Sequence, residues 1–180
     1  MKKICITFSL LIAFSAAVSQ DGGVELYFGG SSSTFRGEVG DVDISRRFSV
    51  QGGFLFLVPI AESFCIKTGL GYSGRGARAD NRDIKLNYVE LPLLFSFGSE
   101  KFDFFAGPQF ALLVGSNTSL GETRDFGVKY GVSAGLSESV FTRLTLYHGF
   151  SGIDDSPGAD VTNRYISLAL GYRFRQKAAE

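Results

Sequence analysis

One stretch of the chain, residues 126–136 with the sequence FGVKYGVSAGL, alternates strictly between apolar side chains and small or polar ones. A period of two indicates a β-strand with two unlike faces. One face carries bulky apolar groups from Phe126 to Leu136, and the other carries only glycine, serine and Lys129. A soluble sandwich needs large inward side chains, whereas a strand between lipid and a narrow polar lumen has this composition. The stretch therefore predicts a membrane-spanning strand.

The N-terminus has the pattern of a secretory signal peptide. Lys2 and Lys3 precede an apolar run over residues 4–14, and small residues follow. The run is short beside the ~20 residues of a membrane-spanning helix, which argues against an uncleaved anchor. We therefore expect a signal peptide over residues 1–20, one barrel domain over residues 21–174, and a C-terminal tail over residues 175–180.

The composition of the remaining chain excludes several classes of protein. It contains one cysteine, Cys65, so no internal disulfide is expected. Over the full sequence, basic and acidic residues balance at 18 each, and no basic patch indicates a nucleic-acid partner. No later apolar run is long enough for a helical span. A membrane-embedded chain must then close into a barrel, because backbone groups in lipid need internal partners.

Seven further segments alternate in the same way, with long and short connections in strict turn. The expected strands cover residues 24–30, 47–58, 64–74, 85–97, 102–114, 126–136, 140–149 and 163–174. Outer-membrane barrels have short turns on the periplasmic side and longer loops outside. Tilted strands of about 9–11 residues cross the bilayer. The sequence therefore predicts an all-β fold, an eight-stranded antiparallel up-and-down transmembrane β-barrel. Pro92 and Pro108, inside two of these strands, are expected to form local bulges.

Several strands resemble those of a known family. Residues 88–94, YVELPLL, are similar to the "YLEIPLL" strand of the PorT-like, porin-family outer-membrane β-barrels that are abundant in Bacteroidetes. Gly107-Pro108 and residues 69–73, 131–138 and 170–174 are also similar, so the resemblance covers essentially the whole mature chain. It implies the same fold and the outer membrane of a Gram-negative bacterium, and it implies an activity only weakly.

Charged side chains on the lumen face are the candidate site. The alternation places seven of them there: Glu25, Lys67, Glu90, Asp103, Lys129, Arg143 and Arg173. An eight-stranded barrel is just wide enough for its own side chains, and an isolated buried ion costs several kcal/mol. We therefore expect a structural network of ion pairs that largely plugs the lumen. A narrow ion channel through the lumen is the alternative.

His148, the single histidine, is expected near the outer end of the seventh strand and facing lipid, with Ser151 shortly after it. Outer-membrane lipid A deacylases are also eight-stranded and use a histidine and a serine on the membrane-facing wall. Here the spacing would put the two side chains on opposite faces, and no carboxylate is placed to orient the base. A non-catalytic interfacial histidine is therefore preferred, and a lipid-modifying enzyme centred on His148 is the alternative.

No cofactor or metal site is expected. Residues 69–74 match a Gly-x-Gly-x-x-Gly pattern but run into a charged loop rather than a helix. The acidic residues of the outer loops lack the spacing of an EF-hand, and we interpret them as solvated: Asp80, Asp83, Asp154, Asp155 and Asp160. Cys65 is expected to be an inert buried thiol.

These observations together predict a non-catalytic structural or surface-binding module of the outer membrane. Its expected partners are outer-membrane lipids and an extracellular or envelope protein bound through the long loops. A soluble periplasmic β-barrel that encloses a ligand is the remaining alternative, and it would require that the apolar faces point inward.

Overall fold

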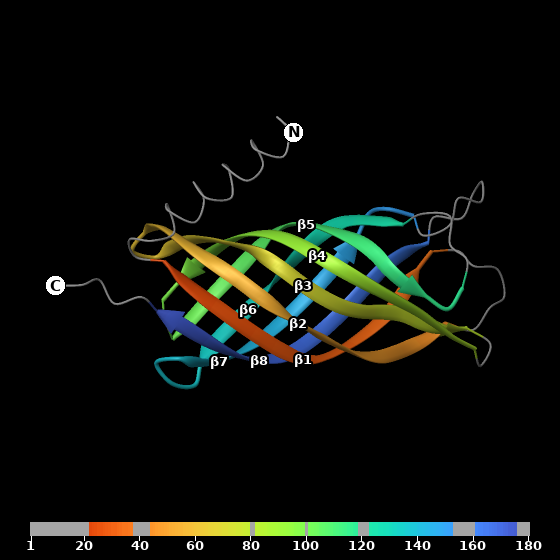
Figure 1. Cartoon of the computed structure of the whole chain (residues 1–180), viewed down its shortest axis with the longest axis horizontal. Helices are drawn as coiled ribbons and strands as arrows, with labels where there is room; N and C mark the ends of the chain where they lie inside the picture. Colours follow the sequence, from red (N-terminus) through yellow and green to blue (C-terminus); the bar gives the residue numbers. More distant parts are fainter. Residues whose placement is uncertain are drawn as a thin grey trace, which may run out of the picture.

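The computed structural model describes residues 22–37, 44–79, 82–99, 101–118, 123–152 and 161–175, which form a closed barrel (Figure 1). The eight strands are β1 (Gly23–Arg36), β2 (Ile44–Ala61), β3 (Phe64–Ala79), β4 (Arg82–Gly98), β5 (Phe102–Ser116), β6 (Arg124–Gly135), β7 (Val140–Gly149) and β8 (Thr162–Arg175). Each strand pairs antiparallel with its neighbour in the sequence, and β8 pairs with β1. The predicted eight-stranded up-and-down barrel is thus confirmed.

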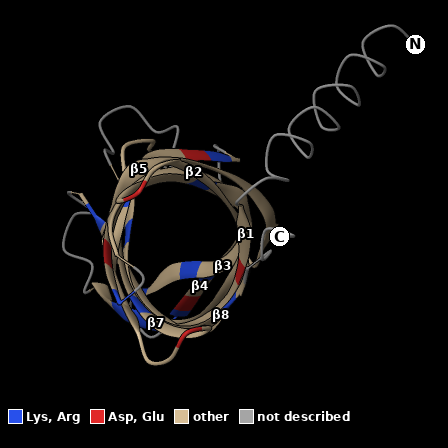
Figure 2. Ribbon diagram, turned by 90° about the vertical axis from the view of Figure 1, so that its left-hand side faces the viewer, with Lys and Arg blue, Asp and Glu red and all other residues tan. Residues whose placement is uncertain are grey.

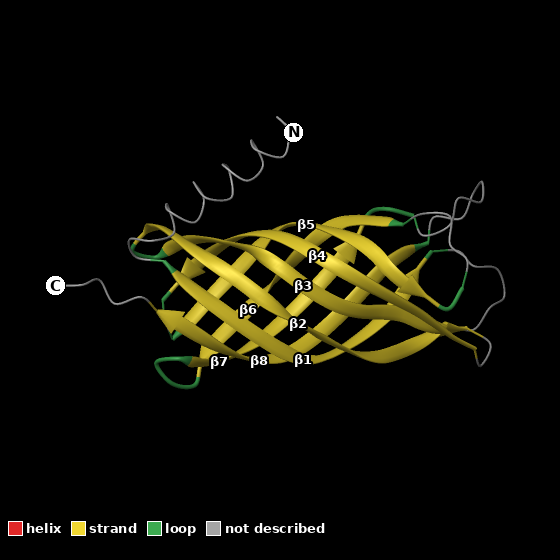
Figure 3. Cartoon of the chain, viewed as in Figure 1, coloured by secondary structure: helices red, strands yellow, loops and turns green. Residues whose placement is uncertain are grey.

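Figure 3 shows strands and loops but no helix in the described parts of the chain, so none of these residues forms a helix that could cross a membrane. The expected signal peptide, residues 1–20, lies outside the described residues, as do residues 176–180 of the expected tail. The short turns between β2 and β3, β4 and β5, and β6 and β7 lie at the end where β1 starts and β8 finishes. Following the arrangement of outer-membrane barrels, we name this the periplasmic end and the opposite one the extracellular end.

Several strands are longer than the sequence pattern predicts, and most of the additional residues lie at the extracellular end. Loops were expected from residue 31 and from residue 75, but β1 continues to Arg36 and β3 to Ala79. The inward Ser33 hydroxyl donates to the carbonyl of Gly76 at 2.8 Å, which ties these extensions together. The loop prediction was wrong because strands that emerge from the bilayer no longer need an apolar face, so their alternation is hard to see.

The bulky apolar side chains point away from the barrel axis. Phe48, Phe28 and Leu168 have exposed fractions of 81%, 67% and 61%. Glu25, Glu90 and many other polar side chains on the inner face are buried. A soluble barrel would have the reverse arrangement, so the alternative of a periplasmic ligand-enclosing barrel is wrong.

Two prolines interrupt the strand ladders without displacing them. The expected bulges at Pro92 and Pro108 do not form, because the pairing of β3 with β4 and of β4 with β5 resumes in the same register beyond each proline. A proline lacks one N–H donor, so a short gap in one ladder is sufficient to accommodate it. The hydroxyl of Thr68 donates to the carbonyl of Pro92 at 2.9 Å and bridges one of these gaps.

Candidate functional site

The lumen contains two clusters of buried charge, which include all seven side chains predicted to lie there. The periplasmic cluster consists of Glu25, Lys67, Asp103, Arg143 and Arg173. The extracellular cluster consists of Arg75, Glu90, Asp125 and Lys129. Figure 2 looks into the barrel from the periplasmic end and shows that charged positions occur on strands all around the ring.

Glu25 is the centre of the periplasmic cluster. Its carboxylate has no exposed surface and accepts from Lys67 Nζ at 3.4 Å and from Arg173 Nη2 at 2.6 Å. Arg143 pairs with the second carboxylate oxygen, so both oxygens have cationic partners. Lys67 Nζ also lies 2.7 Å from Asp103 Oδ2, to which the hydroxyl of Ser96 donates. The desolvation of each carboxylate is therefore offset by several charge-assisted hydrogen bonds.

Glu90 has the same role in the extracellular cluster. Its Oε1 lies 2.6 Å from Arg75 Nη2, and its Oε2 lies 2.7 Å from Lys129 Nζ. Arg75 also pairs with Asp125, which accepts from Asn163 Nδ2 at 3.1 Å.

Three tyrosine rings surround the Arg75 guanidinium. Its central carbon lies 4.6 Å from the ring centroid of Tyr88, 4.3 Å from that of Tyr147 and 5.2 Å from that of Tyr165. Arg75 itself has no exposed surface. Such stacking suits the flat, weakly hydrated guanidinium better than it would suit an ammonium group.

The sequence reasoning missed Arg75 and Asp125. Arg75 was assigned to a charged loop, and Asp125 directly precedes the stretch that we used to define the sixth strand. Both continue the alternation of known lumen residues, because Arg75 follows Lys67 at an even spacing and Asp125 precedes Lys129 at an even spacing. Extending each strand by one residue would have found them.

Two groups of buried apolar side chains pack against the clusters. We name the first group the apolar belt: Tyr27, Leu55, Leu94, Phe105, Phe141 and Ala169. A void of about 10 Å³ lies beside the belt, between Lys129 of one cluster and Arg143 of the other. The second group, the apolar cap, lies towards the extracellular mouth: Leu86, Tyr88, Ala111 and Val161, with Phe35, Ile84 and Leu113 packed against them.

A larger cavity of about 260 Å³ lies at the periplasmic end, between the turns. Lys67, Asp103 and Arg173 line it, so the periplasmic cluster forms part of its wall. Cys65 lines this cavity as well. It was expected to be buried, but it is only half-buried.

Several buried polar atoms have no hydrogen-bond partner among the described residues. They are both amide atoms of Gln109, Asp125 Oδ1, the Tyr147 hydroxyl, Asn163 Oδ1, Arg164 Nε and the Ser167 hydroxyl. Apart from Arg164, all of them belong to residues on the lumen face. An unpaired buried polar group costs about 1–3 kcal/mol, so these positions are suited to ordered water.

His148 lies on the outer wall, as expected, but it is not joined to Ser151. Its Nε2 contacts Nη2 of Arg164, and its ring centroid lies 6.0 Å from that of Phe150. The hydroxyl of Ser151 instead accepts from the backbone N–H of Phe126 at 3.0 Å. Within the described part of the chain, the histidine and serine that a lipid-modifying enzyme would need therefore do not form a pair.

No group of three or more potential metal ligands of the His, Cys, Asp and Glu types occurs among the described residues. Of the acidic loop residues considered above, Asp83 is described, and it pairs with Arg78 at 2.9 Å. Asp80, Asp154, Asp155 and Asp160 lie outside the described residues.

Two solved structures illustrate the similarity of the fold to known proteins. The attachment invasion locus protein Ail of Yersinia pestis superposes with a TM-score of 0.52 at 15% identity, over 86% of this chain and 100% of Ail. Neisserial surface protein A superposes with a TM-score of 0.52 at 13% identity, over 85% of this chain and 97% of that protein. At such identities the likeness concerns the fold alone.

Sequence comparison identifies the family directly. No curated protein matches the chain. Residues 18–154 match the family described as "Outer membrane protein beta-barrel domain", which is more than half of the chain. The chain therefore belongs to this family of outer-membrane β-barrel proteins.

Proposed function

We propose that this protein is a non-catalytic surface-binding module whose closed barrel holds its long connections at the cell surface. The observation that carries the proposal is the filling of the lumen. The two charge clusters fill it together with the apolar belt, which packs on Arg143, and the apolar cap, whose Tyr88 stacks on Arg75. Glu25, Arg75 and Leu86 have no exposed surface. In this proposal, the two clusters of ion pairs serve as a structural plug.

Conductance in planar lipid bilayers tests whether the lumen is closed. The purified wild-type barrel is expected to give no single-channel steps. The double variant L86A/Y88A shortens two side chains of the apolar cap and serves as the positive control, since it should raise ion flow. Steps from the wild type with a defined ion selectivity would contradict the plug.

A narrow ion path is the second candidate, and the unpartnered polar atoms of the lumen favour it. Gln109, Asp125, Tyr147 and Asn163 provide donors and acceptors that water or a small ion could bind. In this case the wild type would conduct, and E90Q would change its ion selectivity because one charge of the extracellular cluster is lost. Silence of both the wild type and E90Q would exclude this path.

Binding at the cell surface is tested by exchanging the long connections. Residues 153–160 and 119–122 are replaced, separately, by glycine–serine segments of equal length, and surface cross-linking is performed on intact cells. We expect at least one replacement to abolish a cross-linked protein that the wild type captures, while the barrel still folds. If the cross-linking pattern is the same for the wild type and both variants, surface binding through these connections is wrong.

The absence of catalysis is tested at His148, which the alternative of a lipid-modifying enzyme requires. The mass spectrum of lipid A from cells that express H148A should match that from cells that express the wild type. A change in the number of acyl chains that depends on His148 would contradict the proposal.

We also propose that residues 1–20 are removed on export and that the chain is a PorT-like member of its family. The pattern of residues 2–20 supports the cleavage, and the YVELPLL strand supports the affiliation. The intact mass of the protein from outer membranes checks the first point. A mature chain that starts well away from residue 21 would contradict it.

A further inference from the structure

Two basic side chains touch on the outer wall, near the extracellular ends of β7 and β8. His148 and Arg164 are partners across these strands, and Nη2 of Arg164 contacts Nε2 of His148. A guanidinium can only donate, so His148 must accept through an unprotonated Nε2. Arg164 Nε is buried and has no hydrogen-bond partner among the described residues. The guanidinium is thus held by a neutral ring, and one of its donors is unused.

A third basic residue lies beside this pair. Arg36 of β1 is opposite Thr162, and Arg164 is opposite Thr34, so Arg36 and Arg164 are diagonal neighbours on one face. We name Arg36, His148 and Arg164 the wall cluster. None of the ion pairs formed among the described residues includes a member of it. This face of the barrel therefore presents positive charge that the described residues leave uncompensated.

The wall cluster lies where the apolar surface of the barrel ends. On β8 the outward residues are all apolar along the membrane-facing wall: Ile166, Leu168, Leu170, Tyr172 and Phe174. Arg164 is the next outward residue towards the extracellular end. Close to His148, the exposed rings of Phe126 and Phe150 lie 6.2 Å apart. The cluster is thus at the depth where acyl chains meet the lipid headgroups of the outer leaflet.

We propose that the wall cluster binds a phosphate group of an outer-leaflet lipid, whose acyl chains lie against the apolar wall below Arg164. The planar guanidinium of Arg164 suits a phosphate, since two parallel N–H groups can donate to two oxygens. Arg36, its diagonal neighbour on the same face, supplies a second positive charge. His148 acts as a positioning residue that fixes the orientation of the guanidinium. The proposal does not depend on whether the lumen conducts.

The test measures thermal unfolding of the purified full chain in phosphatidylcholine vesicles. Three probes are added: lipid A with two phosphates, dephosphorylated lipid A with the same acyl chains, and inorganic phosphate. A ligand that binds only the folded barrel raises its unfolding temperature. We expect the phosphorylated lipid A alone to stabilise the wild type. R164Q should weaken this binding by about tenfold, as expected when one charge-assisted contact is lost, and R36Q should weaken it less.

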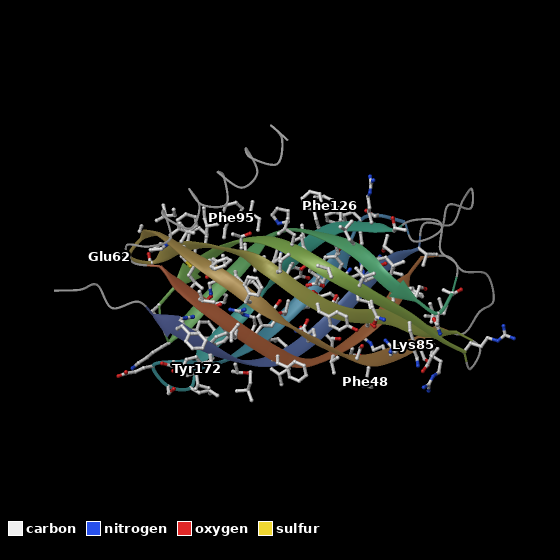
Figure 4. All side chains as sticks on the ribbon, in the orientation of Figure 1. Phe48, Glu62, Lys85, Phe95, Phe126 and Tyr172 are labelled. Carbon is white, nitrogen blue, oxygen red and sulfur yellow. The ribbon has the colours of Figure 1, made fainter. Side chains whose placement is uncertain are left out.

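Matched variants separate a specific site from general attraction. K85Q removes a basic residue from the extracellular end of β4, outside the wall cluster, and should bind as the wild type does (Figure 4). R164K keeps the charge but loses the planar fork, and it should bind with intermediate affinity. The proposal is overturned if R164Q and K85Q weaken binding equally or if both forms of lipid A stabilise the protein equally. It is also overturned if inorganic phosphate stabilises the protein as much as the phosphorylated lipid does, which would indicate a free-anion site.

Discussion

At the scale of single residues, the lumen depends on a few carboxylates that each pair with several cations. Glu25 has partners on β3, β7 and β8, and Glu90 has partners on β3 and β6. Removing Glu25 would take from Arg143 its one carboxylate partner among the described residues and would leave Lys67 and Arg173 with Asp103 alone, which costs more than the loss of one surface pair.

Glu25 should therefore be among the most sensitive positions in the chain. We expect E25Q to lower the free energy of unfolding by about 3–5 kcal/mol, because Lys67, Arg143 and Arg173 lose a shared charged partner. Urea titration in lipid vesicles measures this change. E62Q is the control, since Glu62 is exposed at the periplasmic turn (Figure 4), and it should alter the value by less than about 0.5 kcal/mol. Equal effects of the two variants would contradict the role of the periplasmic cluster.

Arg75 should not tolerate lysine. An ammonium group cannot reach both Glu90 and Asp125 while stacking on three tyrosine rings, so we expect R75K to destabilise the barrel by about 2–3 kcal/mol. R78K serves as the control because Arg78 is exposed and its one ion pair among the described residues is with Asp83. This variant should change stability by less than about 0.5 kcal/mol. The same urea titration applies, and a stability of R75K close to that of the wild type would show that the stacking is unimportant.

At the scale of the strands, some glycines are required because a larger residue would clash with a side chain in the lumen. Gly171 of β8 is paired with Phe141 of β7. A methyl group on Gly171 would lie 2.2 Å from the Phe141 ring, which itself lies under Arg143. Gly30 of β1 differs, because the nearest atom to an added methyl group there is 3.9 Å away.

Alanine should therefore have opposite effects at these two glycines. We expect G171A to destabilise the barrel by about 1–3 kcal/mol through overpacking, whereas G30A should be neutral or slightly stabilising. The substitution F141L should be less damaging in the G171A background than in the wild type, because the smaller side chain relieves the clash. Additive effects in this double-mutant cycle would show that Phe141 and Gly171 do not interact.

The strands also show which parts of the structure could be predicted from the sequence alone. The alternation identified every strand, because each must present an apolar face to lipid along the whole membrane span. It placed Glu25, Glu90 and the other lumen charges correctly by face. It did not identify their partners, since pairing across the lumen depends on strand tilt and register. The extracellular ends of β1 and β3 were not predicted, because both faces of a strand can be polar beyond the membrane.

At the scale of the whole molecule, the outward apolar band determines that the barrel belongs in a bilayer. Leu170 is the central one of the five outward apolar residues on β8 and has an exposed fraction of 59%. An arginine at the middle of the bilayer costs about 2–4 kcal/mol in a barrel, and one near the interface costs about 0–1 kcal/mol.

We therefore expect the cost of an arginine to depend on its depth in the membrane. L170R should destabilise the protein by about 2–4 kcal/mol in lipid vesicles. I60R, at the periplasmic end of β2, should destabilise it by no more than about 1 kcal/mol, although Ile60 is similarly exposed at 57%. Folding into vesicles followed by heat-dependent gel mobility provides the measurement. Indistinguishable costs would place the bilayer elsewhere on the barrel.

The seam between β1 and β8 joins the two strands that are furthest apart in the sequence, in one register from Gly23 to Arg36. Neither strand has its full set of backbone partners until the other arrives, and lipid supplies no substitute. A chain that ended before β8 would leave open edges on both β1 and β7. Pairing of β8 with β1 is thus the step that leaves no open strand edge in the bilayer.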